Sequence, residues 1–222
     1  MRTPVGKLRY AVDHVHPEGL YVASQLSSAC ANPGDEHWKA SANFVRYLKG
    51  AHNVGLTLGG PSPLKPEIFV DASYIEHGEA RSQLGYCTRL GEDAGMIHSK
   101  SMRDKSASLS VAEAELRALK EATQEAMWLK YYLYELDFAV EGPIPIHEDN
   151  QAVVNLVDTL KSCSRTRHLN KIRMFIINQM AKRRIKVKKI AGENNVADIL
   201  TKPLEKTKFL TFRSTMLGER LK

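Results

Sequence analysis

The sequence predicts an α/β protein, with a five-stranded mixed sheet and flanking helices preceded by a small helical segment. Three β-prone runs follow one another near residues 68, 83 and 95, which is typical of an antiparallel meander. Helical and β-prone stretches then alternate, and that order favours a mixed sheet covered by helices. A cluster of chain breakers, Gly59-Gly60-Pro61-Ser62-Pro63, separates these features from the start of the chain, so we expect a boundary there.

Residues 1 to about 58 are predicted to be helical, because apolar side chains recur there at helical spacing. The segment Asn32-Pro33-Gly34-Asp35 interrupts this pattern, and Asp35 is placed to cap the helix that follows. Two helices are therefore expected, one on each side of the break. Their apolar stripes are Val22, Leu26 and Cys30 in the first helix, and Trp38, Ala42, Val45 and Leu48 in the second.

Beyond the breaker cluster, short β-prone runs predict strands, and apolar residues at steps of three and four predict helices. The predicted strands cover residues 68–71, 83–88, 95–99, 143–147 and 185–187. The predicted helices cover residues 111–136, 151–157, 167–182 and 196–201.

The composition is that of a globular protein with a sizeable core. The chain has 222 residues, of which 43% are hydrophobic, and this length allows one ordinary domain with a smaller helical appendage. No apolar run reaches the length of a membrane span, and the N-terminus lacks a signal-peptide core, so we expect no membrane partner. The cysteines Cys30, Cys87 and Cys163 are widely spaced, which argues against structural zinc or disulfides and indicates reduced thiols in an intracellular protein.

One acid falls on the apolar stripe of the long predicted helix. Glu115 lies among the buried positions of its first turns, where a charge needs a partner. Glu113 lies about 200° away around the helix, and Ser110-Val111-Ala112-Glu113 matches the capping-box pattern, so Glu113 is expected to be a cap. The stripe consists of Ala112, Leu119, Ala122, Ala126, Leu129, Leu133 and Leu136.

Three further acids stand at the ends of predicted elements. Asp71 closes the first strand, Asp149 follows the fourth strand, and Asp198 lies in the last helix. Each acid also has a structural interpretation. Asp71 could be exposed at a strand end, Asp149 competes with Asn150 for a helix N-cap, and one of the two asparagines before Asp198 could cap the last helix instead.

In chain order, these four acids stand at strand ends and helix starts, which can converge on one edge of an α/β sheet. Carboxylate oxygens gathered there suit hard cations such as Mg²⁺. Two such ions, about 4 Å apart, can clamp an in-line phosphoryl displacement. The sequence therefore predicts a metal site formed by Asp71, Glu115, Asp149 and Asp198.

A dense basic block lies close to these acids in the sequence. From Lys161 to Lys189 there are eleven Lys or Arg residues and no Asp or Glu, within a chain of net charge +7. Such a block suits a polyanion such as nucleic acid, and the alternative is a solvated helix face. A nucleic-acid partner beside an acidic metal site favours a nuclease.

Five motifs follow in order: Asp71-Ala72-Ser73, Val111-Ala112-Glu113-Ala114-Glu115-Leu116, His147-Glu148-Asp149-Asn150-Gln151, Ser164-Arg165-Thr166-Arg167-His168 and Ala197-Asp198-Ile199-Leu200-Thr201-Lys202-Pro203-Leu204. Together they resemble the RNase H region of copia-type retrotransposon Pol polyproteins. The earlier motifs Val5-Gly6-Lys7-Leu8-Arg9-Tyr10, Glu36-His37-Trp38-Lys39-Ala40 and Arg46-Tyr47-Leu48-Lys49-Gly50 are similar to the stretch that joins the reverse transcriptase to RNase H.

The resemblance implies an RNase H-like fold and endonucleolytic hydrolysis of the RNA strand of an RNA–DNA hybrid. It implies two Mg²⁺ ions, with Mn²⁺ able to substitute, bound by Asp71, Glu115, Asp149 and Asp198 as catalytic and metal-binding acids. Discrimination of RNA from DNA would use contacts to 2′-hydroxyl groups. His168 either orients substrate or caps the basic helix. The residues expected to contact nucleic acid are Arg165, Arg167, His168, Lys171 and Arg173.

The resemblance also divides the chain. Residues 1–60 would be a helical remnant of the reverse transcriptase thumb or connection, 66–204 the RNase H domain and 205–222 a C-terminal tail. The expected partners are the hybrid and the polymerase portion of reverse transcriptase. The expected location is the cytoplasm or nucleus, with virus-like particles as a further setting.

The chain carries no polymerase palm motif of paired aspartates, and no protease or integrase signature, so it is not expected to synthesise DNA by itself. It would begin inside the end of the polymerase domain, as a truncated or decayed copy of an element does. Two alternatives to an active nuclease therefore remain open. One is a catalytically silent fragment that binds nucleic acid, and the other is an appendage that only packs against a separate polymerase chain.

Overall fold

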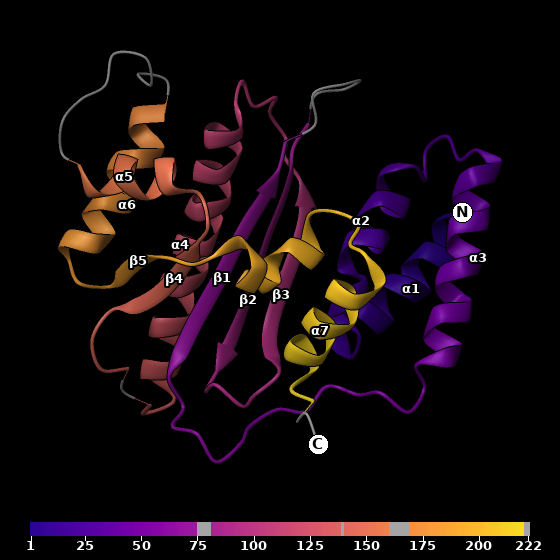
Figure 1. Cartoon of the computed structure of the whole chain (residues 1–222), viewed down its shortest axis with the longest axis horizontal. Coiled ribbons are helices and arrows are strands. Elements are labelled where there is room, and N and C mark those ends of the chain that lie inside the picture. The colour runs from indigo at the N-terminus through magenta and orange to yellow at the C-terminus, as the bar shows by residue number, and fades with distance from the viewer. Residues whose placement is uncertain (75–80, 139, 160–168, 220–222) are drawn as a thin grey trace.

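One mixed sheet is made by the strands β1 (Pro66–Ser73), β2 (Gln83–Leu90), β3 (Met96–Arg103), β4 (Ile144–Glu148) and β5 (Ile185–Lys189). Their spatial order is β3-β2-β1-β4-β5 (Figure 1). The first three strands pair antiparallel, whereas β1, β4 and β5 run parallel to one another. The predicted five-stranded mixed sheet is confirmed in this computed structural model, which describes residues 1–74, 81–138, 140–159 and 169–219.

The described helices include those predicted, but three α-helices instead of two precede the breaker cluster, and α7 (Lys206–Leu217) lies in the predicted tail, where no helix was expected. They are α1 (Arg2–His14), α2 (Leu20–Ser28), α3 (Asp35–Gly50), α4 (Val111–Glu135), α5 (Gln151–Asp158), α6 (Asn170–Ala181) and α7 (Lys206–Leu217), with the 3₁₀ helices η1 (Pro17–Gly19), η3 (Gly192–Asn194) and η4 (Val196–Leu200). The last predicted helix is thus the short η4, since Pro203 cannot continue a helix. Within the described ranges, no helix combines the length and hydropathy needed to cross a bilayer.

The helices α4, α5 and α6 cover one face of the sheet (Figure 1). β1 alternates as a strand should, because Ile68 and Val70 point into the core on this side. Leu116 and Leu119 of α4 and Ile176 of α6 meet them there, fully buried. The long helix is held against the sheet by the apolar stripe that the sequence displays.

The opposite face is covered by η4, α7 and the N-terminal helices, which share one core. Val12 of α1, Leu26 of α2 and Phe44 of α3 belong to the same buried cluster as Phe69 of β1 and Met216 of α7. Polar contacts add to this packing, since Gln83 of β2 contacts the side chains of both Ser24 and Gln25 in α2, at 3.0 and 3.1 Å. The helical segment therefore packs directly on the sheet. The predicted division of the chain into 1–60, 66–204 and 205–222 stays a prediction, although the predicted tail contains α7.

The stripe predicted for the second N-terminal helix is wrong. Trp38 and Val45 are 46% and 51% exposed, whereas the buried positions of α3 are Ser41 and Phe44. Helix α3 packs the face that carries Ser41 and Phe44 against α1 and α2. The predicted stripe lies on a different face because it includes Trp38, whose ring is exposed. The predicted Asp35 cap is also wrong, because α3 begins at Asp35 itself, and the backbone N–H of Gly34 donates to His37 Nδ1 at 3.0 Å.

Candidate metal centre

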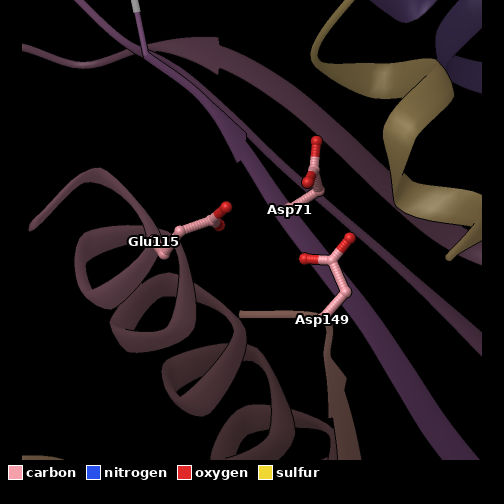
Figure 2. Close-up of side chains that lie close together, drawn as sticks. All are labelled: Asp71, Glu115 and Asp149. Atoms are coloured by element: carbon pink, nitrogen blue, oxygen red, sulfur yellow. The ribbon is translucent and has the colours of Figure 1, made fainter. Parts of the chain in front are cut away.

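Three acids from different parts of the chain meet at one end of the sheet (Figure 2). Asp71 lies in β1, two residues before the end of this strand and not at its end as predicted. Glu115 lies in the second turn of α4, and Asp149 lies directly after β4. β1 and β4 are parallel neighbours in which Val70 pairs with Glu148, so the next residue of each chain segment is an acid of the site. Each carboxylate offers an oxygen, and these oxygens all lie within 4.8 Å of one another.

Asn150 and Asn195 occupy the helix-capping positions that were the structural alternatives for Asp149 and Asp198. The Asn150 side-chain oxygen caps α5 by accepting from the N–H groups of Ala152 and Val153, at 3.0 and 3.3 Å. Asn195 caps η4 in the same way, and its amide also donates to Val70 O at 2.9 Å. Neither Asp149 nor Asp198 is therefore needed as a helix cap.

The two glutamates near the start of α4, Glu113 and Glu115, point in different directions, and Glu113 takes part in the predicted helix cap with Ser110. Ser110 Oγ accepts from Glu113 N at 3.2 Å, and the Glu113 carboxylate accepts from Leu109 N at 3.0 Å, so Glu113 completes the helix start. It also pairs with Arg117 at 2.8 Å. Glu115 points instead into the acid cluster and is 4% exposed.

Asp198 adjoins this cluster through shared partners. Its two carboxylate oxygens lie 2.8 Å from Lys202 Nζ and 2.6 Å from Lys208 Nζ. Lys202 Nζ is also 3.6 Å from Asp71 Oδ2, and the Thr201 hydroxyl contacts the Asp71 carboxylate and, at 3.2 Å, the Asp198 carbonyl oxygen. Among the described residues, the group whose oxygens lie within 4.8 Å of one another contains Asp71, Glu115 and Asp149, with Asp198 beside it.

Burial raises the pKa values of two of these acids. For Asp71, burial together with the charges of Asp198 and Asp149 outweighs the nearby Lys202 and raises the pKa to about 6. For Glu115, burial and the charges of Glu148, Asp71 and Asp149 raise the pKa to about 11. Negative charge is therefore poorly compensated at this point of the protein.

The donors at this point fit a hard divalent cation. They are carboxylate oxygens from rigid elements, which Mg²⁺ prefers. Glu115 Oε2 is buried and, among the described residues, has no hydrogen-bond partner. A cation would satisfy this oxygen and offset the repulsion that raises the pKa of Glu115. Asp71, Glu115 and Asp149 are the residues that would hold it, with Asp198 at the side.

Sequence comparisons show similarity between this chain and parts of much longer polyproteins. No family model matches it. It is 31% identical over 206 residues to a retrovirus-related Pol polyprotein from transposon TNT 1-94 of Nicotiana tabacum, a match that covers 92% of this chain and 15% of the relative. A second such polyprotein, from transposon RE2 of Arabidopsis thaliana, is 30% identical over 209 residues, which cover 94% of this chain and 14% of the relative. Over most of its length, the chain is similar to a segment of copia-type retrotransposon Pol polyproteins. It spans about one seventh of the length of the curated polyproteins it matches.

One curated protein with a different description and one solved structure also match part of the chain. A secreted RxLR effector protein of Plasmopara viticola is 32% identical over 126 residues, covering 56% of this Pol segment and 87% of that protein. Among solved structures, LC11-RNase H1, isolated from compost, is 18% identical with a TM-score of 0.49, and the match covers 62% of this chain and 93% of that one.

A fifth acid near the site, Glu148, is not among the residues that the sequence patterns single out. Glu148 is fully buried, and its Oε1 accepts from Asn150 N at 2.9 Å. Burial and the neighbouring Asp149 and Asp71 raise its pKa well above the ordinary value. The alternation of β4 carries the signal, because Ile144 and Ile146 are buried and Glu148 is next on the same side.

The predicted nucleic-acid contacts of the Pol segment need one correction. Arg173 is 2% exposed, and its guanidinium donates to the carbonyl oxygens of Leu156, at 2.7 Å, and Thr159. Arg173 therefore caps the C-terminal end of α5 and does not face solvent. Lys171 is exposed at the start of α6 and stays a prediction. The predictions for Arg165, Arg167 and His168 lie outside the described residues.

A glycine in β2 allows η4 to lie on the sheet beside the acids. Gly85 pairs with Asp71, and a Cβ at this position would lie 2.7 Å from Leu200 Cβ and 2.8 Å from Thr201 Cγ2. Gly85→Ala is expected to push η4 outward and to lower the free energy of unfolding by about 1–3 kcal/mol. Chemical denaturation would measure this loss. Gly55→Ala is the control, since nothing lies within 4 Å of its added Cβ, and an equal effect of both substitutions would contradict the close packing of η4.

Proposed function

We propose that this Pol segment is a Mg²⁺-dependent endonuclease that hydrolyses the RNA strand of RNA–DNA hybrids. The observation that carries the proposal is the meeting of Asp71, Glu115 and Asp149 at one end of the sheet, with oxygens within 4.8 Å of one another. The resemblance of its five motifs to the RNase H region of copia-type polyproteins supplies the substrate and the reaction. The polymerase portion of the polyprotein is the proposed partner.

The four acids together would bind two divalent cations. Asp71, Glu115 and Asp149 would bind cations directly, and Asp198 would complete the set from η4. When bound, divalent cations supply activation of the attacking water and neutralise charge that develops on the phosphate and the departing 3′-oxygen. Rigid attachment of the acids to β1, α4 and the end of β4 keeps their oxygens in place without a reorganisation cost.

Basic residues of the edge strand would hold the substrate next to these acids. Lys186, Lys188 and Lys189 are exposed on β5, and the Lys189 ammonium donates to the Asp149 carbonyl oxygen. The positive charge of the edge strand thus reaches the metal centre itself. Lysines placed in this way contact backbone phosphates of either strand, so they would add affinity without sequence preference.

Cleavage of a labelled hybrid tests the proposal. The protein is incubated with an RNA–DNA hybrid carrying a 5′-labelled RNA strand, with millimolar Mg²⁺ or with a chelator, and the products are resolved by length. We expect internal cleavage of the RNA strand that requires the cation, and at least about 100-fold slower cleavage of a DNA duplex of the same sequence. Asp149→Asn is the inactive variant, and Asp158→Asn, an exposed residue at the end of α5, is the matched control.

Each outcome of this assay has a clear meaning. Equal cleavage by Asp149→Asn and the parent protein would show that the metal assignment is wrong. Retention of the hybrid in a gel shift, without cleavage at millimolar Mg²⁺, would support the silent nucleic-acid-binding fragment instead. Binding that weakens steeply with added salt would identify the contacts as phosphate contacts.

A further inference from the structure

Both oxygens of the Asp198 carboxylate already have a positively charged partner. Lys202 Nζ lies 2.8 Å from Oδ1, and Lys208 Nζ lies 2.6 Å from Oδ2. Lys202 follows Asp198 by four residues, so it belongs to the same local segment. Lys208 comes from α7, a separate helix, and is therefore a partner that the tertiary fold brings to the site.

The positive charge near the acids is unevenly distributed. Glu115 Oε2 is buried without a hydrogen-bond partner among the described residues, and Asp71 has Lys202 no closer than 3.6 Å. Asp198 is 2% exposed and, by contrast, has an ammonium group within 2.8 Å of each carboxylate oxygen, although its Oδ1 accepts no hydrogen bond from the described residues. A cation that approaches the three clustered acids meets unpaired oxygens, whereas a cation that approaches Asp198 has to displace an ammonium group.

The packing of α7 holds Lys208 in this position. Phe212, Met216 and Leu217 of α7 are buried, and the first two belong to the same core cluster as Phe69 of the sheet. The ammonium of Lys208 also lies 5.1 Å from the centre of the Phe212 ring, a distance at which the ring attracts a cation. The side chain is still 37% exposed, so it can move without unfolding the helix.

We propose that Lys208 sets the order in which divalent cations bind to this site. The free protein takes one cation at Asp71, Glu115 and Asp149, and a second binds at Asp198 only after Lys208 has moved away. A phosphodiester brought to the site offers the ammonium another anionic partner, so substrate binding and the second cation are coupled. This inference rests on the proposed nuclease function and adds Lys208 to it as a positioning residue.

Counting bound Mn²⁺ ions tests the inference without any cleavage. Free Mn²⁺ is measured by electron paramagnetic resonance during titration of the folded full chain in the absence of nucleic acid. We expect one bound ion for the parent protein and two for Lys208→Gln, with the second site tightened at least about tenfold. Lys206→Gln, an exposed lysine of the same helix, removes the same charge and is expected to bind one ion. Circular dichroism checks folding, and Lys208→Met serves if the glutamine variant is unstable.

A second measurement uses the parent protein alone. Addition of a hybrid whose RNA strand carries 2′-O-methyl groups, and so resists cleavage, is expected to raise its bound Mn²⁺ from one ion to two. Two equivalent ions on the free parent protein, or equal binding by Lys208→Gln and Lys206→Gln, would overturn the role of Lys208. A Glu115→Gln variant that binds the first ion as tightly as the parent would instead overturn the metal site of the proposed function. A parent protein that binds no ion would also overturn this metal site, and the proposed role of Lys208 would be overturned with it.

Discussion

The Glu115→Gln variant is expected to lose hybrid cleavage by at least about 100-fold and, without divalent cations, to be more stable than the parent protein. Cleavage falls because an amide oxygen is a much weaker ligand for Mg²⁺ than a carboxylate. Stability rises because Glu115 is buried among Glu148, Asp71 and Asp149, which disfavour its charge. A gain of about 1 kcal/mol would raise Tm by about 2–4 °C in a protein of this size. Thermal unfolding in a chelator measures it.

The stability gain has a defined pH dependence. The Glu115 pKa is raised from 4.5 to about 11 by folding, so the folded state binds the proton more tightly than the unfolded state. The contribution of this carboxyl to stability is therefore fully present below about pH 4.5, and it is lost as pH rises towards the folded value. The advantage of Glu115→Gln should be small at pH 4.5 and larger at pH 8. An advantage that shrinks with rising pH would contradict this assignment.

A neighbouring substitution on the same helix gives the opposite pattern. Glu113→Gln weakens the ion pair with Arg117 and the contact with Leu109 N at the start of α4. We expect it to lower Tm while cleavage at low temperature stays within about threefold of the parent. Identical behaviour of the two glutamine variants would mean that the two glutamates do not have separate structural and metal-binding roles.

Replacing Arg173 by methionine is expected to cost about 3 kcal/mol of stability and to leave the intrinsic affinity for the hybrid unchanged. The buried guanidinium donates to the carbonyl oxygens of Leu156 and Thr159 at the end of α5, and methionine removes both of these hydrogen bonds. A loss of this size would lower Tm by roughly 6–12 °C. Urea denaturation and hybrid binding at low temperature measure the two quantities separately.

Lys171→Met on the same helix is the matched control for Arg173→Met. Lys171 is exposed, so its removal should leave Tm nearly unchanged and weaken hybrid binding in a salt-dependent way. If Arg173→Met proves stable and instead binds the hybrid weakly, its guanidinium has a role in substrate binding that its buried position does not indicate.

The sequence predicted the parts of the site that depend on local periodicity and strand order. Glu115 stands out because it interrupts an apolar stripe, and Asp71 and Asp149 can be placed together because parallel neighbouring strands end at the same edge of a sheet. The structure shows that Asn150 and Asn195 cap α5 and η4, so Asp149 and Asp198 are not needed as caps. The sequence alone does not decide which of the neighbouring residues is the cap.

Other parts of the site depend on contacts between distant segments, which local patterns do not encode. Nothing in the pattern of residues 205–217 indicates that Lys208 reaches Asp198, because the predicted tail carries no strong amphipathic stripe. The basic block predicts that Arg173 contacts nucleic acid, but α6 orients this side chain towards the interior of the protein. Glu148 does not stand out in the sequence because it directly precedes Asp149, although strand alternation places it on the buried side.

The N-terminal helices lie on the same buried surface as Phe69, Cys87 and Met96 of the sheet, and this has a practical consequence for anyone preparing a minimal nuclease. A shortened protein that starts at residue 66 would leave these side chains facing water, together with the apolar side of α7. Such a surface promotes self-association, so poor solubility of the trimmed protein would reflect a missing cover over the sheet and not a defect of the metal centre.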